Sequence, residues 1–367
     1  MDIATIAIPL ALILAIIDGL NNASNAISWA IGGGLISIRK ALLIASIFEV
    51  IGSVVFGFYI IDMVSYRLIT DFNLLKYSFL PISIYASSII WSVLASIVKV
   101  PISFSMAIIG SILGSLSVYG KNSIDWNTAL YIFIGWITAF IISIALTTLF
   151  LVFNDRFSKH RNIYIYLGII SIASILTLLI SKPLKPYSSN TSTAILIFLV
   201  FSAILSYIFR LNSYRYTLAS LTLISMMHGA NDAALIASIL MLCINSLEGY
   251  TYLSIAIPAI GIAIGVLVWG HRIADTLASS ITFIDIRYIS AIYISEFIAI
   301  ALLLRIGLPT PISLVTIGAL IGFGIYRGLK IIRFSYAVKS MFITLASTPI
   351  CIAISYIMTL IINILTR

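Results

Sequence analysis

Long apolar runs fill most of this 367-residue chain and leave too few charged residues to form a water-exposed surface. Only 9% of the residues are charged, whereas a soluble domain carries about 25%. A membrane-spanning helix needs about 20 mostly apolar residues. The sequence therefore predicts an all-α polytopic membrane protein with about 10–12 transmembrane segments, and it argues against an enzyme. The runs lie at roughly 3–36, 41–61, 82–100, 102–119, 127–153, 163–181, 193–209, 216–243, 251–269, 286–306, 309–325 and 335–364.

The net charge of +9 comes from basic residues distributed along short loops. Because these residues are not clustered on one face, orientation in a membrane explains them better than nucleic-acid binding does. The positive-inside rule places three basic loops in the cytoplasm, which predicts a multi-pass protein of the cell membrane, of prokaryotic composition. The three loops contain Arg156, Lys159 and Arg161, then Arg210 and Arg215, then Arg327, Lys330 and Arg333.

An internal repeat organises the chain. Residues 18–28 match residues 228–238 at a spacing of 210, with identities that include Gly19 with Gly229 and Asn21 with Asn231. The triplets at 101–103 and 311–313 keep the spacing of 210, whereas a later pair of glycines has a spacing of 208. Paired polar and proline breaks are typical of transporters built from inverted repeats with discontinuous helices. We expect a first repeat over 1–152, connecting segments over 153–215 and a second repeat over 216–367. The stretch 82–119 is interpreted either as two spans or as a re-entrant hairpin.

The polar breaks carry the chemistry that we expect at the centre of the membrane. An unwound helix at Gly19 or Gly229 would direct free N–H groups toward one point, which suits an oxyanion. A carboxylate such as Asp232 beside freed carbonyl oxygens suits a hard cation, and ionisable groups inside a membrane are costly unless they are functional. The alternative interpretation is that Gly19 and Gly229 allow helices to pack closely and do not unwind. Asp18, Glu49 and His228 lie within or beside apolar runs and are further candidates, while Glu296 could instead pair with Arg305 in one run.

Energetics favours coupled transport. Moving one negative charge inward against 100 mV costs about 2.3 kcal/mol, and the sequence has no Walker-type nucleotide-binding loop. An anion importer would then need coupled cations, either sodium or protons, and no other cofactor is expected. A passive anion channel and a non-transporting relative remain the alternatives.

These motifs resemble the PiT family of inorganic phosphate transporters, which move phosphate with sodium or protons. The first family signature is similar to residues 19–26 with the glycines at 32–34, and the second is similar to residues 228–234. The proline- and serine-rich family loops resemble 101–110 and 308–318, so the likeness covers about 15–120 and 215–328. The sequence departs from the pattern at Asn22, where the family has Asp, at Leu235, where it has Asn, and at Trp29, where it has a small hydroxyl residue.

The resemblance implies which residues hold the substrate and the coupling ion. Phosphate would be bound by Asn21, Asn25, Ser103, Ser105, Asn231 and Ser313. The coupling cation would be bound by Asp232, Glu49 and the position of Asn22. We therefore expect a cation-coupled phosphate symporter that works by alternating access in the lipid bilayer. Sulfate or another oxyanion is the alternative substrate, and a homodimer is an alternative to a monomer.

Overall fold

The computed structural model describes residues 3–71, 74, 79–97, 102–156, 213–244, 250–271, 286–328 and 334–366. Within these ranges the chain is almost entirely helical, and its single pair of β-bridged residues is Ile69 with Ile124. The all-α membrane fold that the sequence predicts is confirmed. The predicted runs at 163–181 and 193–209, and most of the connecting region 153–215, lie outside the described residues.

Seven of the described helices are long and apolar enough to cross a membrane, and a bent pair of helices raises this number to eight. The bent pair consists of α2 (Ile38–Phe56) followed by α3 (Phe58–Met63) and η1 (Val64–Leu68), with an angle of 51° between the two parts. The predicted total of about 10–12 also included the two runs outside the described residues and two shorter apolar helices, which are described below.

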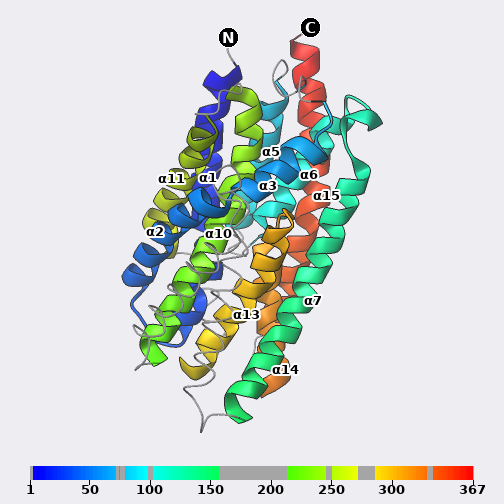
Figure 1. The fold of residues 1–367 in the computed structure, drawn as a ribbon. Helices are drawn as coiled ribbons and strands as arrows, with labels where there is room; N and C mark the ends of the chain where they lie inside the picture. Colours follow the sequence, from blue (N-terminus) through cyan, green and yellow to red (C-terminus); the bar gives the residue numbers. More distant parts are fainter. Residues whose placement is uncertain are drawn as a thin grey trace, which may run out of the picture.

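The first half of the chain begins with α1 (Ile3–Gly32). This helix ends where the N–H of Leu35 donates to the carbonyl of Ala30 and Gly34 adopts a φ of +65°. A left-handed residue at this point is the usual helix stop, and glycine adopts that conformation without strain. The chain then turns into α2, which lies beside α1 and rises in the opposite direction (Figure 1).

A helical hairpin follows. It consists of α5 (Leu80–Ile97) and the shorter α6 (Phe104–Ser117), which pack against each other. The bridge between Ile69 and Ile124 joins the chain segments on either side of this hairpin, so the chain enters and leaves it at one place. At 1.5 Å per residue, the 14 residues of α6 are only about 21 Å long, too short to cross a bilayer core of about 30 Å. Of the two predicted alternatives for 82–119, the structure favours the re-entrant hairpin. The 3-10 turn η2 (Lys121–Ser123) then leads to α7 (Trp126–Arg156).

The second half repeats this order of elements. Helices α10 (Ser213–Ile244) and α11 (Tyr250–Trp269) correspond to α1 and α2, and α15 (Phe334–Leu365) corresponds to α7. The second hairpin consists of α13 (Ile286–Arg305) and α14 (Ile312–Arg327). A glycine with positive φ, Gly307 at +82°, ends α13 and begins the turn into α14.

Corresponding helices of the two halves run in opposite directions in Figure 1. Helix α1 descends from the end that carries both chain termini, whereas α10 rises toward that end; α7 descends and α15 rises. Helix α6 occupies the upper half of the molecule and α14 the lower half, and both start near its middle. The halves are intertwined, because α7 packs against α13 and α14, while α15 packs against α5 and α6.

Reciprocal backbone contacts join the halves at four glycines. A Cβ atom on Gly19 would lie 2.1 Å from the carbonyl oxygen of Ile262, and one on Gly229 would lie 1.9 Å from that of Glu49. Gly52 and Gly265 make the matching contacts with the carbonyls of Met226 and Ile16. No residue with a side chain fits these sites unless the helices move apart. The glycines therefore bring α10 onto α2, and α1 onto α11, at close range.

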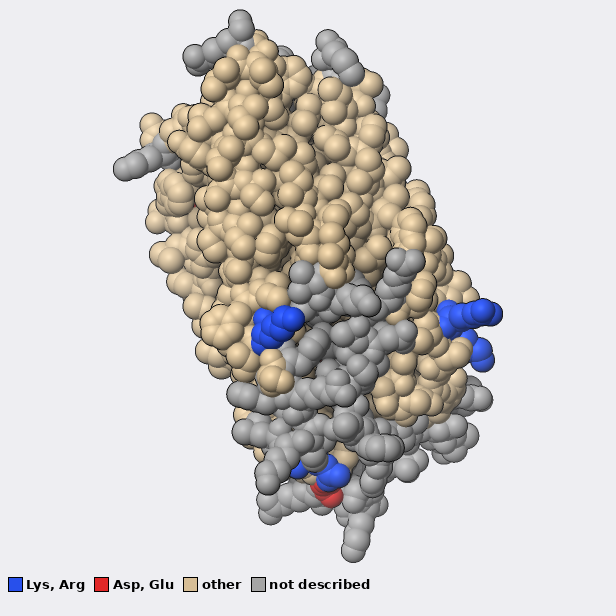
Figure 2. Space-filling view, turned by 180° about the vertical axis from the view of Figure 1, so that it is seen from behind, with Lys and Arg blue, Asp and Glu red and all other residues tan. Residues whose placement is uncertain are grey.

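The outer surface suits a bilayer. Large apolar side chains such as Ile137 on α7 and Ile357 on α15 are more than half exposed, whereas many serines and threonines are buried inside the bundle. In the view of Figure 2, the described Lys and Arg side chains lie only in the half of the molecule away from the chain termini. We call this the basic end. It contains the last residue of α14, Arg327.

Candidate functional site

The tips of the two hairpins meet at the centre of the molecule. Ser105, in the first turn of α6, donates a hydrogen bond of 2.7 Å to the carbonyl of Thr310. Ser313, in the first turn of α14, donates one of 2.6 Å to the carbonyl of Ile102. Each tip thus binds the other through one serine hydroxyl, and the N-termini of α6 and α14 converge on one region. Helix N-termini carry partial positive charge and free N–H groups, so this region favours an oxyanion.

The register of this contact differs from the predicted one. Helices α6 and α14 begin 208 residues apart, at Phe104 and Ile312. The predicted equivalence of the triplets 101–103 and 311–313, at a spacing of 210, is therefore wrong for the hairpins. In the structure Ser105 corresponds to Ser313 and Ile102 to Thr310, which agrees with the spacing of 208 that the later glycine pair indicated.

Ser103 has a local role in this structure. It is the N-cap of α6, and its side chain accepts a hydrogen bond of 3.3 Å from the N–H of Met106. A hydroxyl at this position satisfies an otherwise free donor of the first helical turn. Its counterpart at the start of α14 is Pro311, whose side chain cannot form such a bond.

Two asparagines of the repeated motif hold the hairpin tips. Asn21 on α1 accepts a hydrogen bond of 3.1 Å from the N–H of Ile102 and donates one of 3.2 Å to Ser96. Asn231 on α10 accepts one of 2.7 Å from the N–H of Thr310 and donates to the carbonyl of the same residue at 2.9 Å. The sequence repeat thus corresponds to a repeated contact, in which each asparagine fixes the hairpin tip of its own half.

At the centre, the motifs of the two halves bind each other directly. The amide nitrogen of Asn22 donates to Asp232 Oδ2 at 2.8 Å and to Asp18 Oδ1 at 2.7 Å. The other oxygen of Asp232 accepts a bond of 2.7 Å from Asn231, which also donates to Ser105 at 2.8 Å. One connected network therefore runs from the carboxylates of Asp18 and Asp232 to the hairpin tips.

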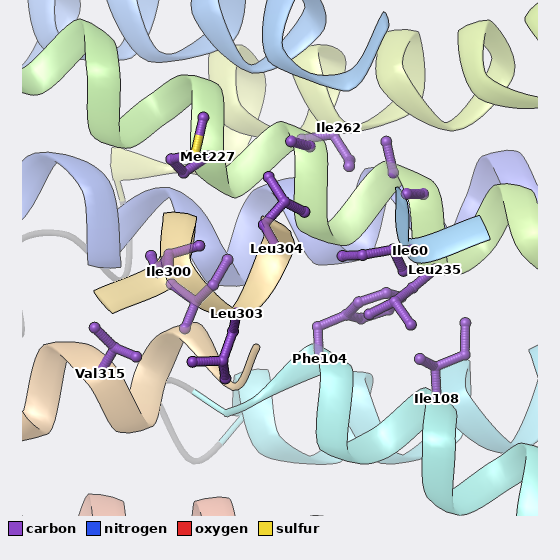
Figure 3. Close-up of a cluster of buried hydrophobic side chains, with 14 of the residues drawn as sticks. Ile60, Phe104, Ile108, Met227, Leu235, Ile262, Ile300, Leu303, Leu304 and Val315 are labelled. Carbon is purple, nitrogen blue, oxygen red and sulfur yellow. The ribbon is translucent and has the colours of Figure 1, made fainter. Parts of the chain in front are cut away.

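Asn25 connects the same network to the second tip. Its amide nitrogen donates to the side-chain oxygen of Asn22 at 3.0 Å and to Ser313 at 2.9 Å. Its own oxygen is buried and has no hydrogen-bond partner among the described residues. The position that corresponds to Asn25 in the second half is Leu235, which lies beside Ile60 and Phe104 in an apolar cluster (Figure 3).

Three carboxylates are buried around this network: Asp18 and Asp232 are 2% exposed and Glu49 is 3% exposed. They lie close enough to repel one another electrostatically. One oxygen of Asp18 and one of Glu49 have no hydrogen-bond partner in the part of the chain that the structure describes. No described basic residue forms an ion pair with these three carboxylates; the ion pair of Asp62 with Arg67 lies at the exposed surface. Buried negative charge without basic partners favours a bound cation.

The predicted unwinding of the motif helices is wrong. Both α1 and α10 continue as helices through Gly19 and Gly229. The two glycines serve close packing, as their contacts with Ile262 and Glu49 show. The free N–H groups that the prediction placed in α1 and α10 are found instead at the starts of α6 and α14.

Two further candidates, His228 and Glu296, lie outside the central hydrogen-bond network. His228 is buried, and neither ring nitrogen has a hydrogen-bond partner among the described residues, so the structure does not bring it into the network. The alternative pairing of Glu296 with Arg305 does not occur. Arg305 lies over the ring of Tyr59, 5.8 Å from its centre, whereas Glu296 accepts a hydrogen bond of 3.1 Å from the indole of Trp29.

The backbone groups of Ile102 and Thr310 are the parts of the site that sequence reasoning missed. Both residues are uncharged, so their side chains give no sign of a role in binding. The spacing of 208 between the hairpin glycines was the available signal, because it aligns these two positions.

No group of three or more His, Cys, Asp or Glu side chains that could hold a metal ion occurs in the described part of the chain. An ion in this site would therefore need amide and backbone oxygens in addition to the carboxylates. Asn22, Asn25 and the carbonyls of the two hairpin tips supply such oxygens. The donor set is consistent with a hard cation, which prefers oxygen ligands.

Comparisons with known proteins support a transport role. The model of the phosphate transporter family matches residues 18–364. A candidate phosphate permease of Pyrococcus furiosus is 27% identical over 90% of this chain and 89% of its own length. One of Pyrococcus abyssi is 26% identical over 96% of both chains. A solved structure titled as the sodium-dependent phosphate transporter has the same fold, with a TM-score of 0.90 and 22% identity over 99% of this chain and 100% of that chain.

Proposed function

Because this chain belongs to the phosphate transporter family, we propose that it carries inorganic phosphate through the cell membrane together with a cation, sodium or a proton. The observation that carries the proposal is the central network, which joins the buried carboxylates of Asp18 and Asp232, with that of Glu49 close by, to two converging helix N-termini. The first feature requires positive charge and the second attracts an oxyanion. A site with both features binds the two ions together more readily than either alone.

The hairpin tips supply the phosphate ligands. Ser105 and Ser313 now donate to carbonyls of the opposite tip. A phosphate between the tips would accept these hydroxyl hydrogens in place of the carbonyls, along with the first N–H groups of α6 and α14. Asn25 would contribute from the side of α1, and Asn21 and Asn231 would hold the tips in place.

The candidate cation ligands include the unpartnered oxygens of Asp18 and Glu49 and the carboxylate of Asp232; because these side chains do not by themselves form a metal-binding group among the described residues, amide and backbone oxygens would complete the ligand set. Cation binding and phosphate binding are linked through Asn231, which contacts both Asp232 and Ser105. By thermodynamic reciprocity, a cation that strengthens phosphate binding is itself bound more strongly when phosphate is present.

Phosphate is favoured over sulfate by the unpartnered oxygen of Asn25. Near neutral pH phosphate retains a proton that it can donate, whereas sulfate has none. A buried acceptor that lies beside Ser313 suits the protonated anion, because an unsatisfied buried acceptor costs about 1–3 kcal/mol.

For the transport cycle, we propose that the halves 1–152 and 216–367 are inverted repeats that alternate access to this site, joined by segments within 153–215. The opposite directions of corresponding helices and the reciprocal glycine contacts support this arrangement. The positive-inside rule then assigns the basic end to the cytoplasm.

Uptake of labelled phosphate into proteoliposomes tests the proposal. Sodium and pH gradients are imposed separately, with unlabelled phosphate or sulfate as competitor. We expect accumulation above equilibrium with at least one gradient and competition by phosphate. Uptake that follows neither gradient would contradict cation coupling, and stronger competition by sulfate would identify sulfate as the substrate.

A further inference from the structure

The tip of the second hairpin is held from two sides. Trp136 on α7 donates its indole hydrogen to the carbonyl of Pro309 at 3.0 Å, and Asn231 on α10 accepts the N–H of Thr310 at 2.7 Å. This carbonyl and this N–H belong to one peptide unit, which we call the tip peptide. The C=O and N–H of a planar trans peptide point in opposite directions. Helices α7 and α10 therefore bind the tip peptide from opposite sides.

The indole of Trp136 is itself fixed in place. The side chain is buried, and the ring of Phe133 packs against it edge to face, with 4.9 Å between the ring centres. A buried indole N–H needs an acceptor. The carbonyl of Pro309 precedes α14, which begins at Ile312, so it takes no part in the hydrogen bonds of that helix. The contact satisfies a buried donor and a buried acceptor together.

The tip peptide lies directly before the donors that α14 offers to an anion. The N–H groups of Leu314 and Val315 donate to the carbonyl of Pro311, whereas those of Ile312 and Ser313 lie at the open start of the helix, where N–H groups have no partner within the helix. These two groups follow the tip peptide by only two or three residues. A rotation of the tip peptide would redirect both of them.

Helix α7 supports the second hairpin along its length. Ser143 donates a hydrogen bond of 2.7 Å to the carbonyl of Val315, and Thr148 donates one of 3.3 Å to that of Gly322. Trp136 lies seven residues, about two helical turns, before Ser143 on the same helix. Its contact extends this row of hydrogen bonds from the body of α14 to the tip.

The first hairpin has no matching indole. At the spacing of 208 residues Thr344 on α15 corresponds to Trp136, and α15 contains no tryptophan. The hydroxyl of Thr344 is buried and has no hydrogen-bond partner among the described residues. The next polar contact along α15 is that of Thr348, which donates to the carbonyl of Met106 at 3.1 Å, already inside α6. The indole contact at a hairpin tip is thus a feature of the second half.

We propose that Trp136 is a positioning residue for phosphate binding. Together with Asn231 it fixes the tip peptide, so that the free N–H groups of α14 and the hydroxyl of Ser313 keep the directions that an anion between the tips requires. Donors that are fixed before binding lose less conformational freedom when the anion arrives. The role in phosphate binding rests on the proposed function, whereas the fixing of the tip peptide can be measured without it.

Trp136→Phe tests the positioning role, because it keeps an aromatic ring beside Phe133 and removes the indole donor. We expect the Kd for labelled phosphate to rise about tenfold, which corresponds to about 1.4 kcal/mol. The KM of uptake should rise with it, while the maximal rate stays at the wild-type level. Trp91→Phe is the matched control. It removes an indole donor that binds Ser347 on α15 at 2.9 Å and no hairpin tip, so phosphate affinity should not change.

Two results would overturn the proposal. One is an unchanged phosphate affinity in Trp136→Phe, or an equal loss of affinity in both Trp→Phe variants. The other is a fall in the maximal rate and in the unfolding temperature without a change in Kd, because that pattern belongs to a residue that only supports packing.

An isosteric residue keeps the test decisive if Trp136→Phe does not fold. The residue 3-benzothienylalanine in place of Trp136 preserves the two-ring shape and replaces the N–H group with sulfur. It should weaken phosphate binding by the same factor as the Phe variant. Wild-type affinity with this residue would show that the indole hydrogen bond does not position the tip.

Hydrogen–deuterium exchange of the purified protein measures the tip without phosphate. Exchange reports how often a local structure opens, so the N–H groups of residues 310–313 should exchange faster in Trp136→Phe than in the wild type and Trp91→Phe. Equal exchange in all three proteins would overturn the fixing of the tip peptide. If the wild type binds no phosphate, the proposed function fails, while the exchange result still decides whether Trp136 holds the tip.

Discussion

Helices α1 and α10 carry the same motif but surround the central site differently. Asn21 and Asn231 have equivalent roles, since each fixes one hairpin tip. At the next position Asn22 faces Asp232, and the neutral amide donates to the carboxylate. Asn25, four residues after Asn21, continues the polar network, whereas Leu235, four residues after Asn231, belongs to an apolar cluster. The two halves therefore share the residues that hold the hairpin tips but differ in the side chains that face the central site.

This comparison separates packing from binding. The residues that hold the halves together are repeated as pairs, as at Gly19 and Gly229. The residues that carry charge are not repeated. Asp232 in the second half corresponds to the neutral Asn22 in the first. The residue packed against Gly229 is the acid Glu49, whereas the residue packed against Gly19 is the apolar Ile262. Equal substitutions in the two halves should therefore have equal effects on stability at the glycines and unequal effects on transport at the polar positions.

The largest effect is expected at the glycines. Gly19→Ala and Gly229→Ala each place a Cβ atom about 2 Å from a backbone oxygen of the other half, which forces helices apart. Both variants should lose most of the folded protein, measured by size-exclusion chromatography in detergent. Gly135→Ala is the control, because its nearest neighbour is the Leu308 side chain, which can move. If only one of the two variants lost folded protein, the result would contradict the structural equivalence of the two halves.

Asp232→Asn should have the next largest effect. It neutralises the carboxylate that Asn22 and Asn231 both bind, so we expect cation-dependent phosphate uptake to be abolished while the helical content by circular dichroism stays unchanged. Asp62→Asn makes the same chemical change at an exposed ion pair and should leave uptake at the wild-type level. Cation-stimulated uptake retained in Asp232→Asn would exclude Asp232 as a coupling residue.

Asn231→Ala should destabilise the protein more than Asn21→Ala. Asn231 binds both the N–H and the carbonyl of Thr310 and also Ser105, whereas Asn21 binds one tip N–H and Ser96. Each buried donor left unsatisfied costs about 1–3 kcal/mol. The midpoint of thermal unfolding should therefore fall further for Asn231→Ala, and equal shifts would show that the two tips are held equally.

Asn22→Asp should produce the smallest and most specific change. The substitution replaces a donor to Asp18 and Asp232 with a fourth carboxylate. Without sodium the variant should unfold at a lower temperature than the wild type. Added sodium should restore its stability and raise either the sodium affinity or the number of sodium ions per phosphate. A variant that responds to sodium as the wild type does would place position 22 outside the cation site.

The sequence predicted the membrane fold and most of the central residues because both depend on patterns that a single chain displays. Apolar length identifies spans, and the repeated motif identifies Asn21, Asn22, Asn231 and Asp232, which the structure joins in one network. It did not predict that α1 and α10 stay helical through the motif. A glycine that permits unwinding and one that permits close contact look alike until the opposite helix is placed.

The partner of Glu296 was also beyond sequence reasoning. The basic residues on the same helix, Arg287 and Arg305, are each nine residues from Glu296, or about 13 Å along the helix. Trp29, 267 residues away in the chain, is the observed partner. Such contacts depend on how the second hairpin lies against α1, which local patterns do not specify.

The most direct test of the account is the equilibrium binding of labelled phosphate to the purified protein, measured at increasing sodium and at several pH values with constant ionic strength. The account predicts that sodium or protons strengthen phosphate binding in the wild type, because Asn231 links the carboxylates to the hairpin tips, and that Asp232→Asn loses this dependence. Phosphate binding that changes with neither sodium nor pH in the wild type would contradict it.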